Sequence, residues 1–168
     1  MKKLFFLIVL GVLSLTAVAQ TRFGYFSYEE VLKSMPDYVL AQRSIDDLRV
    51  KYDAELKRAE EEFNSKYEEF LEVQKDLVPA ILRKRQAELQ EMMQKNINFK
   101  NESKRLLQQA ETDAFAPVKV KLNEALTKVG QAQGYAFILN TDGNACPYVN
   151  PEMGENATEL VKEALNAK

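Results

Sequence analysis

A glycine- and proline-free stretch, from Tyr38 to about Lys75, most constrains how this chain can fold. Its apolar residues recur at spacings of 3, 4, 4, 3, 4, 4 and 3, an eleven-residue repeat, and charged residues fill the positions between them. This pattern predicts one straight helix with a narrow apolar stripe, roughly 55–60 Å long at 1.5 Å per residue. A compact domain of this mass is narrower than that, so we expect a protruding arm. The stripe consists of Ile45, Leu48, Tyr52, Leu56, Ala59, Phe63, Tyr67 and Phe70.

The segment DLVPAILRKR, residues 76–85, interrupts the helical pattern. Proline is well tolerated at the first position of a helix, so Pro79 predicts a turn followed by a returning helix over about 80–115. A continuous helix with a proline kink is the alternative. The returning helix follows a heptad pattern with a partly polar seam, which should pack loosely. Its apolar seam residues are Leu82, Leu89, Met92, Phe99, Leu106 and Ala110, and its polar ones are Arg85, Asn96 and Ser103.

The region before the long helix predicts a short strand and a short helix. Residues 22–27 are rich in aromatics and read as a strand. Ser27 and Glu30 have the spacing of a capping box, so a helix over about 28–35 should follow. Pro36 ends that helix, and Asp37 is the predicted N-cap of the long one.

The region after the returning helix predicts a junction, a strand pair and a final helix. Ala116-Pro117 marks a kink or junction, and Gly134 is a natural helix stop. Residues 135–139 read as a strand, the D-G signal at 141–144 predicts a hairpin turn, and 145–149 reads as the second strand. Pro147 places that strand at an edge or a bulge, and the spacing of Asn156 and Glu159 predicts the start of a final helix over about 157–167.

Together these elements predict an α+β fold: a long antiparallel helical hairpin that projects from a small β-rich body. The predicted hairpin is 38–117 with its tip near 76–82, and the body combines 20–37 with 118–168. Such a small body has too little core to be stable alone and leaves strand edges open, so we expect it to assemble as an oligomer. The candidate body residues for that assembly are Phe23, Tyr25, Phe26, Tyr135, Phe137, Ile138 and Leu139.

The first nineteen residues read as a signal peptide, with a basic start, an apolar run and a cleavage motif ending at Ala19. A membrane anchor is less favoured because the apolar run is short. Without Lys2 and Lys3 the net charge falls from −2 to −4, which argues against a general nucleic-acid binder. Cys146 is the single cysteine, and a small apolar role is favoured over a redox or interchain one. Histidine is absent, and we expect no catalytic residue, cofactor or metal site.

Three segments carry a resemblance to a known family: FGYFSYEEVLKSMPDYVLAQRSIDDL (23–48), AFAPVKVKLNEALTKVGQAQGY (114–135) and GYAFILNTDGNACPYVNPEMGENATELVKEAL (134–165). In order and spacing they resemble the Skp, or OmpH-like, family of periplasmic chaperones. The resemblance implies a homotrimer with a central β-body and three helical tentacles around a cavity. It further implies an ATP-independent holdase that binds unfolded outer-membrane β-barrel proteins in that cavity and prevents their aggregation before membrane insertion.

Residues that could contact a client lie on both predicted helices. Methionine is flexible and polarisable, which suits non-specific apolar contacts. The alternative is that these side chains pack the two helices together; it is favoured for the aromatics of the first helix and evenly balanced for Met93 and Phe99. The candidates are Met92, Met93, Phe99, Phe63, Tyr67 and Phe70.

The predicted tip also carries a basic cluster, Lys75, Arg83, Lys84 and Arg85. Ordinary solvated helix ends are the favoured interpretation, and a weak contact with a membrane surface is the alternative. The best-known members of the family are strongly basic, whereas this chain is acidic. An exported coiled-coil scaffold without chaperone activity is the second functional hypothesis, and the many glutamates along a solvated helix do not suggest an enzyme.

Overall fold

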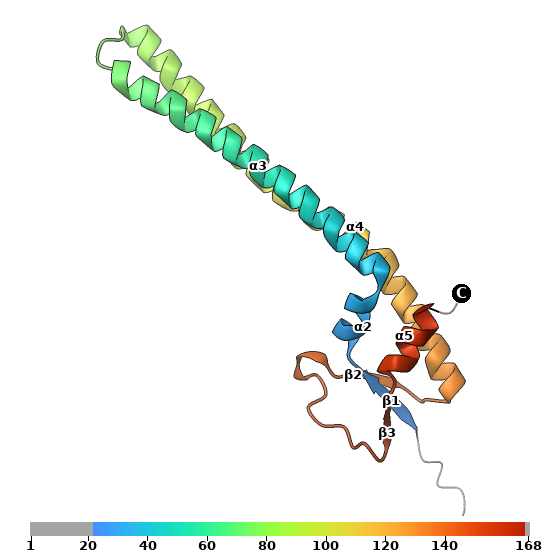
Figure 1. Cartoon of the computed structure of the whole chain (residues 1–168). Coiled ribbons are helices and arrows are strands. Elements are labelled where there is room, and N and C mark those ends of the chain that lie inside the picture. The colour runs from blue at the N-terminus through green and yellow to red at the C-terminus, as the bar shows by residue number, and fades with distance from the viewer. Residues whose placement is uncertain (1–21, 167–168) are drawn as a thin grey trace, which may run out of the picture. The chain divides into compact units, whose positions relative to one another are not determined.

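The computed structural model describes residues 22–166 (Figure 1). The predicted signal peptide and its cleavage site lie outside these residues. The chain divides into two compact units. The hairpin unit comprises Leu32–Lys121, and the sheet unit comprises the described residues up to Val31 and from Leu122 onward. The elements are, in order, β1 (Phe23–Phe26), α2 (Tyr28–Ser34), α3 (Pro36–Val73), α4 (Pro79–Gln133), β2 (Ile138–Asn140), β3 (Gly154–Asn156) and α5 (Thr158–Asn166).

The hairpin unit is built mainly from α3 and from α4 up to Lys121, which run antiparallel. The rings of Tyr38 and Phe115 lie 5.1 Å apart, and those of Tyr52 and Phe99 lie 6.3 Å apart. The side-chain amide of Asn96 donates a hydrogen bond of 3.0 Å to the carbonyl oxygen of Ala59. Residue numbers therefore rise along one helix as they fall along the other, as an antiparallel hairpin requires.

The apolar stripe of α3 faces α4 as predicted, although few of its side chains are fully buried. Ile45 and Phe70 are buried, whereas Tyr67 is exposed. A hairpin of two helices has only one neighbour per helix, so most seam side chains keep one side open to solvent. The partly buried members are Leu48, Tyr52, Leu56, Ala59 and Phe63.

The heptad predicted for the returning helix is wrong at Leu106, although Ala110 is partly buried as predicted. Leu106 is 37% exposed, and Leu107 takes the inward position instead. From Asn96 onward the inward residues recur at spacings of 3, 4, 4, 3 and 4, which matches the eleven-residue repeat of α3. Two nearly straight helices stay in register over this length only if both stripes have a period near 3.67 residues.

The observed helix boundaries confirm some of the predicted helix starts and ends and correct others. α3 begins at Pro36 with Met35 as its N-cap, so Asp37 lies in the first turn and is not the cap. Proline provides the dihedral of a first helical position, which moves the start two residues earlier than predicted. α4 begins at Pro79, as predicted, but continues through Pro117 to Gln133. Gly134 then ends it with φ +65°, the left-handed stop predicted for this glycine.

The sheet unit contains three parallel strands in the order β2-β1-β3 (Figure 1). β1 is central: Gly24 pairs with Ile138 of β2 and with Glu155 of β3. One short strand lies on each side of β1. The outer edges of β2 and β3 therefore have no partner strand within the described chain. The parallel arrangement means that neither neighbour is joined to β1 by a tight turn.

The predicted hairpin between 135–139 and 145–149 is wrong. The strand before the turn is shorter, and residues 145–149 form no strand. The carboxylate of Asp142 instead accepts hydrogen bonds from the Ser27 hydroxyl, at 2.7 Å, and from the Glu29 amide, at 2.6 Å. This holds the turn against the start of α2, and the second pairing strand begins only at Gly154.

The core of the sheet unit gathers side chains from every helix of the unit. Leu122, Val31 and Val161, from α4, α2 and α5, are the largest side chains fully closed to solvent. Other buried residues add to this layer, and the predicted capping by Ser27 and Asn156 sets the starts of α2 and α5. These further buried residues are Phe26, Ala125, Val129 and Ala157.

Candidate functional site

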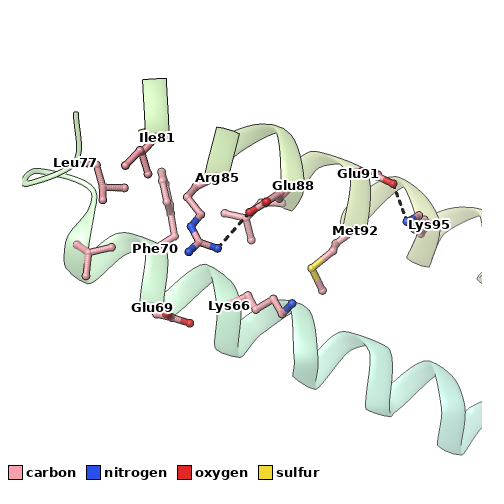
Figure 2. A pocket seen from close by; sticks show the side chains of 12 residues that line it. Lys66, Glu69, Phe70, Leu77, Ile81, Arg85, Glu88, Glu91, Met92 and Lys95 are labelled. Atoms are coloured by element: carbon pink, nitrogen blue, oxygen red, sulfur yellow. Dashed lines mark hydrogen bonds and ion pairs between the residues drawn. The ribbon is translucent and has the colours of Figure 1, made fainter. Parts of the chain in front are cut away.

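A cleft of about 470 Å³ lies between the end of α3 and the start of α4 (Figure 2). We call it the tip cleft. The loop 74–78 joins the two helices beside the cleft, and Leu77 of this loop is part of the lining. The apolar residues that line it are Phe70, Val73, Leu77, Ile81, Leu89 and Met92.

Charged side chains surround this apolar lining in equal numbers of each sign. Arg85 pairs with Glu88 at 3.3 Å, and Lys95 pairs with Glu91 at 2.7 Å (Figure 2). The hydrogen bond from Lys95 lowers the pKa of the Glu91 carboxyl. The full set of charged residues is Lys66, Glu69, Arg85, Glu88, Glu91 and Lys95.

The pairing of these charges determines what the tip cleft can accept. The third cation, Lys66, lies 3.7 Å from Glu62 on its own helix. An anionic ligand would therefore compete with carboxylates already in place. A cationic ligand would compete with Lys or Arg at Glu88 and Glu91, whereas Glu69 has no ion pair among the described residues. An uncharged apolar group does not have to break these ion pairs, and its binding is favoured because it buries apolar surface against the apolar lining.

A second groove of about 350 Å³ lies on the other side of the hairpin seam. Asn64 of α3 and Ile97 of α4 line it, together with Phe63 and Met93. Asn64 and Lys66 are two residues apart, about 200° around a helix, so the groove and the tip cleft open on different faces. The hairpin unit thus exposes apolar side chains on two sides.

The structure divides the predicted client-contact residues between these two sites. Phe70 and Met92 line the tip cleft, whereas Phe63 and Met93 line the groove. Phe70 is buried and so packs the hairpin, in line with the packing interpretation, while Met93 is 48% exposed.

The two other candidates lie beside aromatic partners. Tyr67 stacks on Phe63 with ring centres 6.0 Å apart, and Phe99 packs edge-on to Tyr52.

The four residues of the predicted basic cluster have different surroundings. Lys84 and Arg85 both pair with Glu88, at 3.7 and 3.3 Å. Arg85 borders the tip cleft, while Lys75 lies in the loop and Arg83 is exposed on α4. The local charge at the tip is therefore partly neutralised within α4.

Sequence reasoning missed the apolar character of the tip. Val73, Val78 and Ile81 are all exposed, with Val78 at 58%. The sequence LVPAIL, residues 77–82, indicated it, because turns are usually polar and this segment is apolar throughout.

The predicted body residues gather around β1 and β2. Phe26 is buried, whereas Phe137 is 49% exposed and stacks on Phe23 with ring centres 5.4 Å apart. Tyr135 packs over Gly24 of β1. Tyr25, Ile138 and Leu139 are half-buried members of the β1–β2 pair.

Comparisons with known proteins identify this architecture. The family model for outer membrane proteins of the OmpH-like kind matches residues 22–165, and the chain belongs to this family. A solved structure from Caulobacter crescentus CB15, described as an outer membrane chaperone of the OmpH-like kind, has the same fold. Its TM-score is 0.71 at 19% identity, over 86% of this chain and 83% of that one. A search of curated proteins finds no significant match.

Within residues 22–166, no helix combines the length and apolar character needed to cross a membrane.

Proposed function

We propose that this protein is an ATP-independent holdase chaperone of the periplasm. In this proposal it binds unfolded outer-membrane β-barrel proteins and prevents their aggregation before membrane insertion. The observation that carries the proposal is the exposure of apolar side chains along a thin helical hairpin in a member of the OmpH-like family. Exposed apolar side chains that lie close together often mark a binding surface, and Val73, Val78 and Ile81 lie within nine residues of one another at the tip of the hairpin.

The proposal includes a homotrimer with clients held between three hairpins. The open edges of β2 and β3 support assembly, because unpaired strand edges favour further pairing. The exposed ring of Phe137 beside β2 supports an apolar contact at one of these edges. The proposal also includes export, with a signal peptide removed after Ala19.

The mechanism relies on many weak contacts. Each apolar side chain of the hairpin unit would contribute little to the binding free energy. A client therefore stays mobile while its exposed strands are kept apart. The partly polar seam at Asn96 and Ser103 should let α3 and α4 separate to fit clients of different size.

The test is an aggregation assay with a β-barrel protein diluted from urea. The purified chain should suppress light scattering at about one oligomer per client. A chain that forms the oligomer but leaves aggregation unchanged would instead be a scaffold, and the chaperone proposal would be wrong.

The oligomer has its own test, a mass measurement in solution. Phe137→Asp should shift the mass toward the monomer, whereas Tyr148→Asp, in the exposed 145–153 loop, should not. A wild-type chain that is monomeric at micromolar concentration would contradict the trimer. Circular dichroism checks that both variants keep their helices.

A further inference from the structure

The tip cleft is a narrow apolar site within a single hairpin, and the proposed function does not by itself say what enters it. Resting on that function, we propose that the tip cleft binds an extended segment of about six residues in which apolar and polar residues alternate. The apolar side chains enter the cleft, and the polar ones point to solvent.

The length of the cleft sets the length of the segment. Its lining on α4 extends from Ile81 to Lys95, about 21 Å along the helix axis at 1.5 Å per residue. An extended chain advances about 3.3 Å per residue, so about six residues span this distance. Every second side chain of such a segment points to the same face, which places three side chains along the cleft.

The volume and width of the cleft agree with a single row of side chains. A volume of about 470 Å³ lies within the range of pockets that hold apolar ligands. Spread over about 21 Å, that volume leaves a channel too narrow for a whole backbone with side chains on both faces. One face of the segment therefore enters, and the other remains outside.

An extended segment fits better than a helical one. A helix spanning the same 21 Å would need about 14 residues. Isolated helices of that length are marginal in water, so an unfolded chain seldom presents one. Strands of outer-membrane β-barrels alternate apolar and polar residues, so an unfolded barrel protein contains many segments of the required pattern.

The charges around the cleft disfavour an acidic residue in the segment. Lys66, Arg85 and Lys95 are each paired with a glutamate one turn away on the same helix. An acidic side chain entering the lining would be desolvated without a free partner, because these three cations are already engaged. We therefore expect Asp at one of the three inward positions to weaken binding strongly.

Two labelled peptides of identical composition test the pattern by fluorescence anisotropy with the purified chain. One alternates apolar and polar residues, and the other groups its apolar residues in one block. The alternating peptide should bind at least about fivefold more tightly. Equal affinity, or tighter binding of the blocked peptide, would overturn the proposal.

Two double variants test the location. Val73→Ser with Ile81→Ser removes apolar lining from both helices of the cleft. Val50→Ser with Val120→Ser makes matched changes at exposed positions of the same helices outside it. Valine, isoleucine and serine have similar helix propensities, so the helices should persist. The cleft variant should weaken binding of the alternating peptide by about tenfold and the control by less than twofold.

A cross-linking experiment gives a result that does not depend on any variant. The alternating peptide carrying a photo-reactive phenylalanine at its central apolar position should attach within residues 66–95. Attachment elsewhere in the chain, or equal losses in both double variants, would overturn the proposal. The aggregation assay separates the two hypotheses. If the wild type suppresses aggregation but the peptide does not bind in the cleft, the proposed function stands and this inference is wrong. If the wild type does not suppress aggregation, the proposed function is wrong.

Discussion

Gly24 lies directly against the ring of Tyr135. A Cβ atom placed on Gly24 would be 2.9 Å from Cε2 of that ring and 3.4 Å from Cβ of Ala157. Gly24 lies in β1, the central strand of the sheet, and Tyr135 follows the end of α4, so this contact joins segments more than a hundred residues apart. Only a residue without a side chain lets the ring approach the central strand this closely.

The first prediction concerns this contact. Gly24→Ala should reduce the free energy of unfolding by about 1–3 kcal/mol, because the added methyl group overpacks a closed layer. The matched control is Gly130→Ala, in α4, where the nearest atom to a new Cβ is Cδ1 of Ile138 at 3.7 Å. The control should raise stability by up to about 1 kcal/mol. Urea unfolding measures both, and a stable Gly24→Ala would show that the ring moves aside freely.

The second prediction concerns the hydroxyl of Tyr135, which is buried without a hydrogen-bond partner among the described residues. Burial raises the pKa of this hydroxyl to about 12, and the Glu155 carboxylate, near but outside hydrogen-bonding geometry, acts in the same direction. The unfolded chain loses the proton near pH 10 and the folded chain near pH 12. Stability should therefore fall as the pH rises through that window.

The test compares Tyr135→Phe with the wild type. The variant should lose less thermal stability between about pH 9 and pH 11. Near pH 7 it should be as stable as the wild type, or more stable by about 1 kcal/mol, since no hydrogen bond is lost. Identical alkaline profiles for the two chains would contradict the prediction.

The third prediction concerns Asp142. The hydrogen bond from the Ser27 hydroxyl, followed by that from the Glu29 amide, lowers the pKa of this carboxyl below 3.8. The stabilisation is present above that value and is lost as the pH falls through the lower pKa of the folded chain. Asp142→Asn should lower the Tm near pH 7 and flatten its fall below about pH 4. Asp53→Asn, exposed on α3, is the control and should leave the profile unchanged.

The fourth prediction concerns Ser103, which is 3% exposed and has no hydrogen-bond partner among the described residues. Ser103→Ala removes an unpaired buried hydroxyl and improves helix propensity. It should raise the free energy of unfolding by about 0.5–1 kcal/mol. Asn96→Ala is the contrasting variant, because it breaks the hydrogen bond to Ala59 across the seam and should cost about 1 kcal/mol. A destabilised Ser103→Ala would show that the hydroxyl is bonded in solution.

The fifth prediction concerns motion within the hairpin unit. Amides of residues 80–110 should exchange with solvent faster than those near Leu122 and Val161, because few seam side chains are fully buried there. Hydrogen exchange followed by mass spectrometry measures this. Equal protection in the two regions would contradict the idea that α3 and α4 separate around a client.

Local signals predicted several elements well. Three correct predictions each depended on a short stretch of chain: the period of the α3 stripe, the start of α4 at Pro79 and its end at Gly134. The heptad of the returning helix failed at Leu106, because the register of a seam depends on the partner helix. The prediction of a strand over 145–149 was wrong because Asp142 binds residues that lie far away in the sequence.

The candidate site was predicted only in part. Met92 and Phe70 were recognised, but the tip cleft was not, since a cleft depends on how far apart two helices lie. Val73 and Ile81 were not among the predicted site residues, and the structure places both in the lining of the cleft.

The sequence alone determined two long helices joined at Pro79, because helical periodicity and proline stereochemistry act within a few residues of each position. The tertiary structure decided the parallel pairing of β2 and β3 with β1 and the open channel at the tip. Both depend on contacts between segments distant in sequence, whose energies no local pattern of residues encodes.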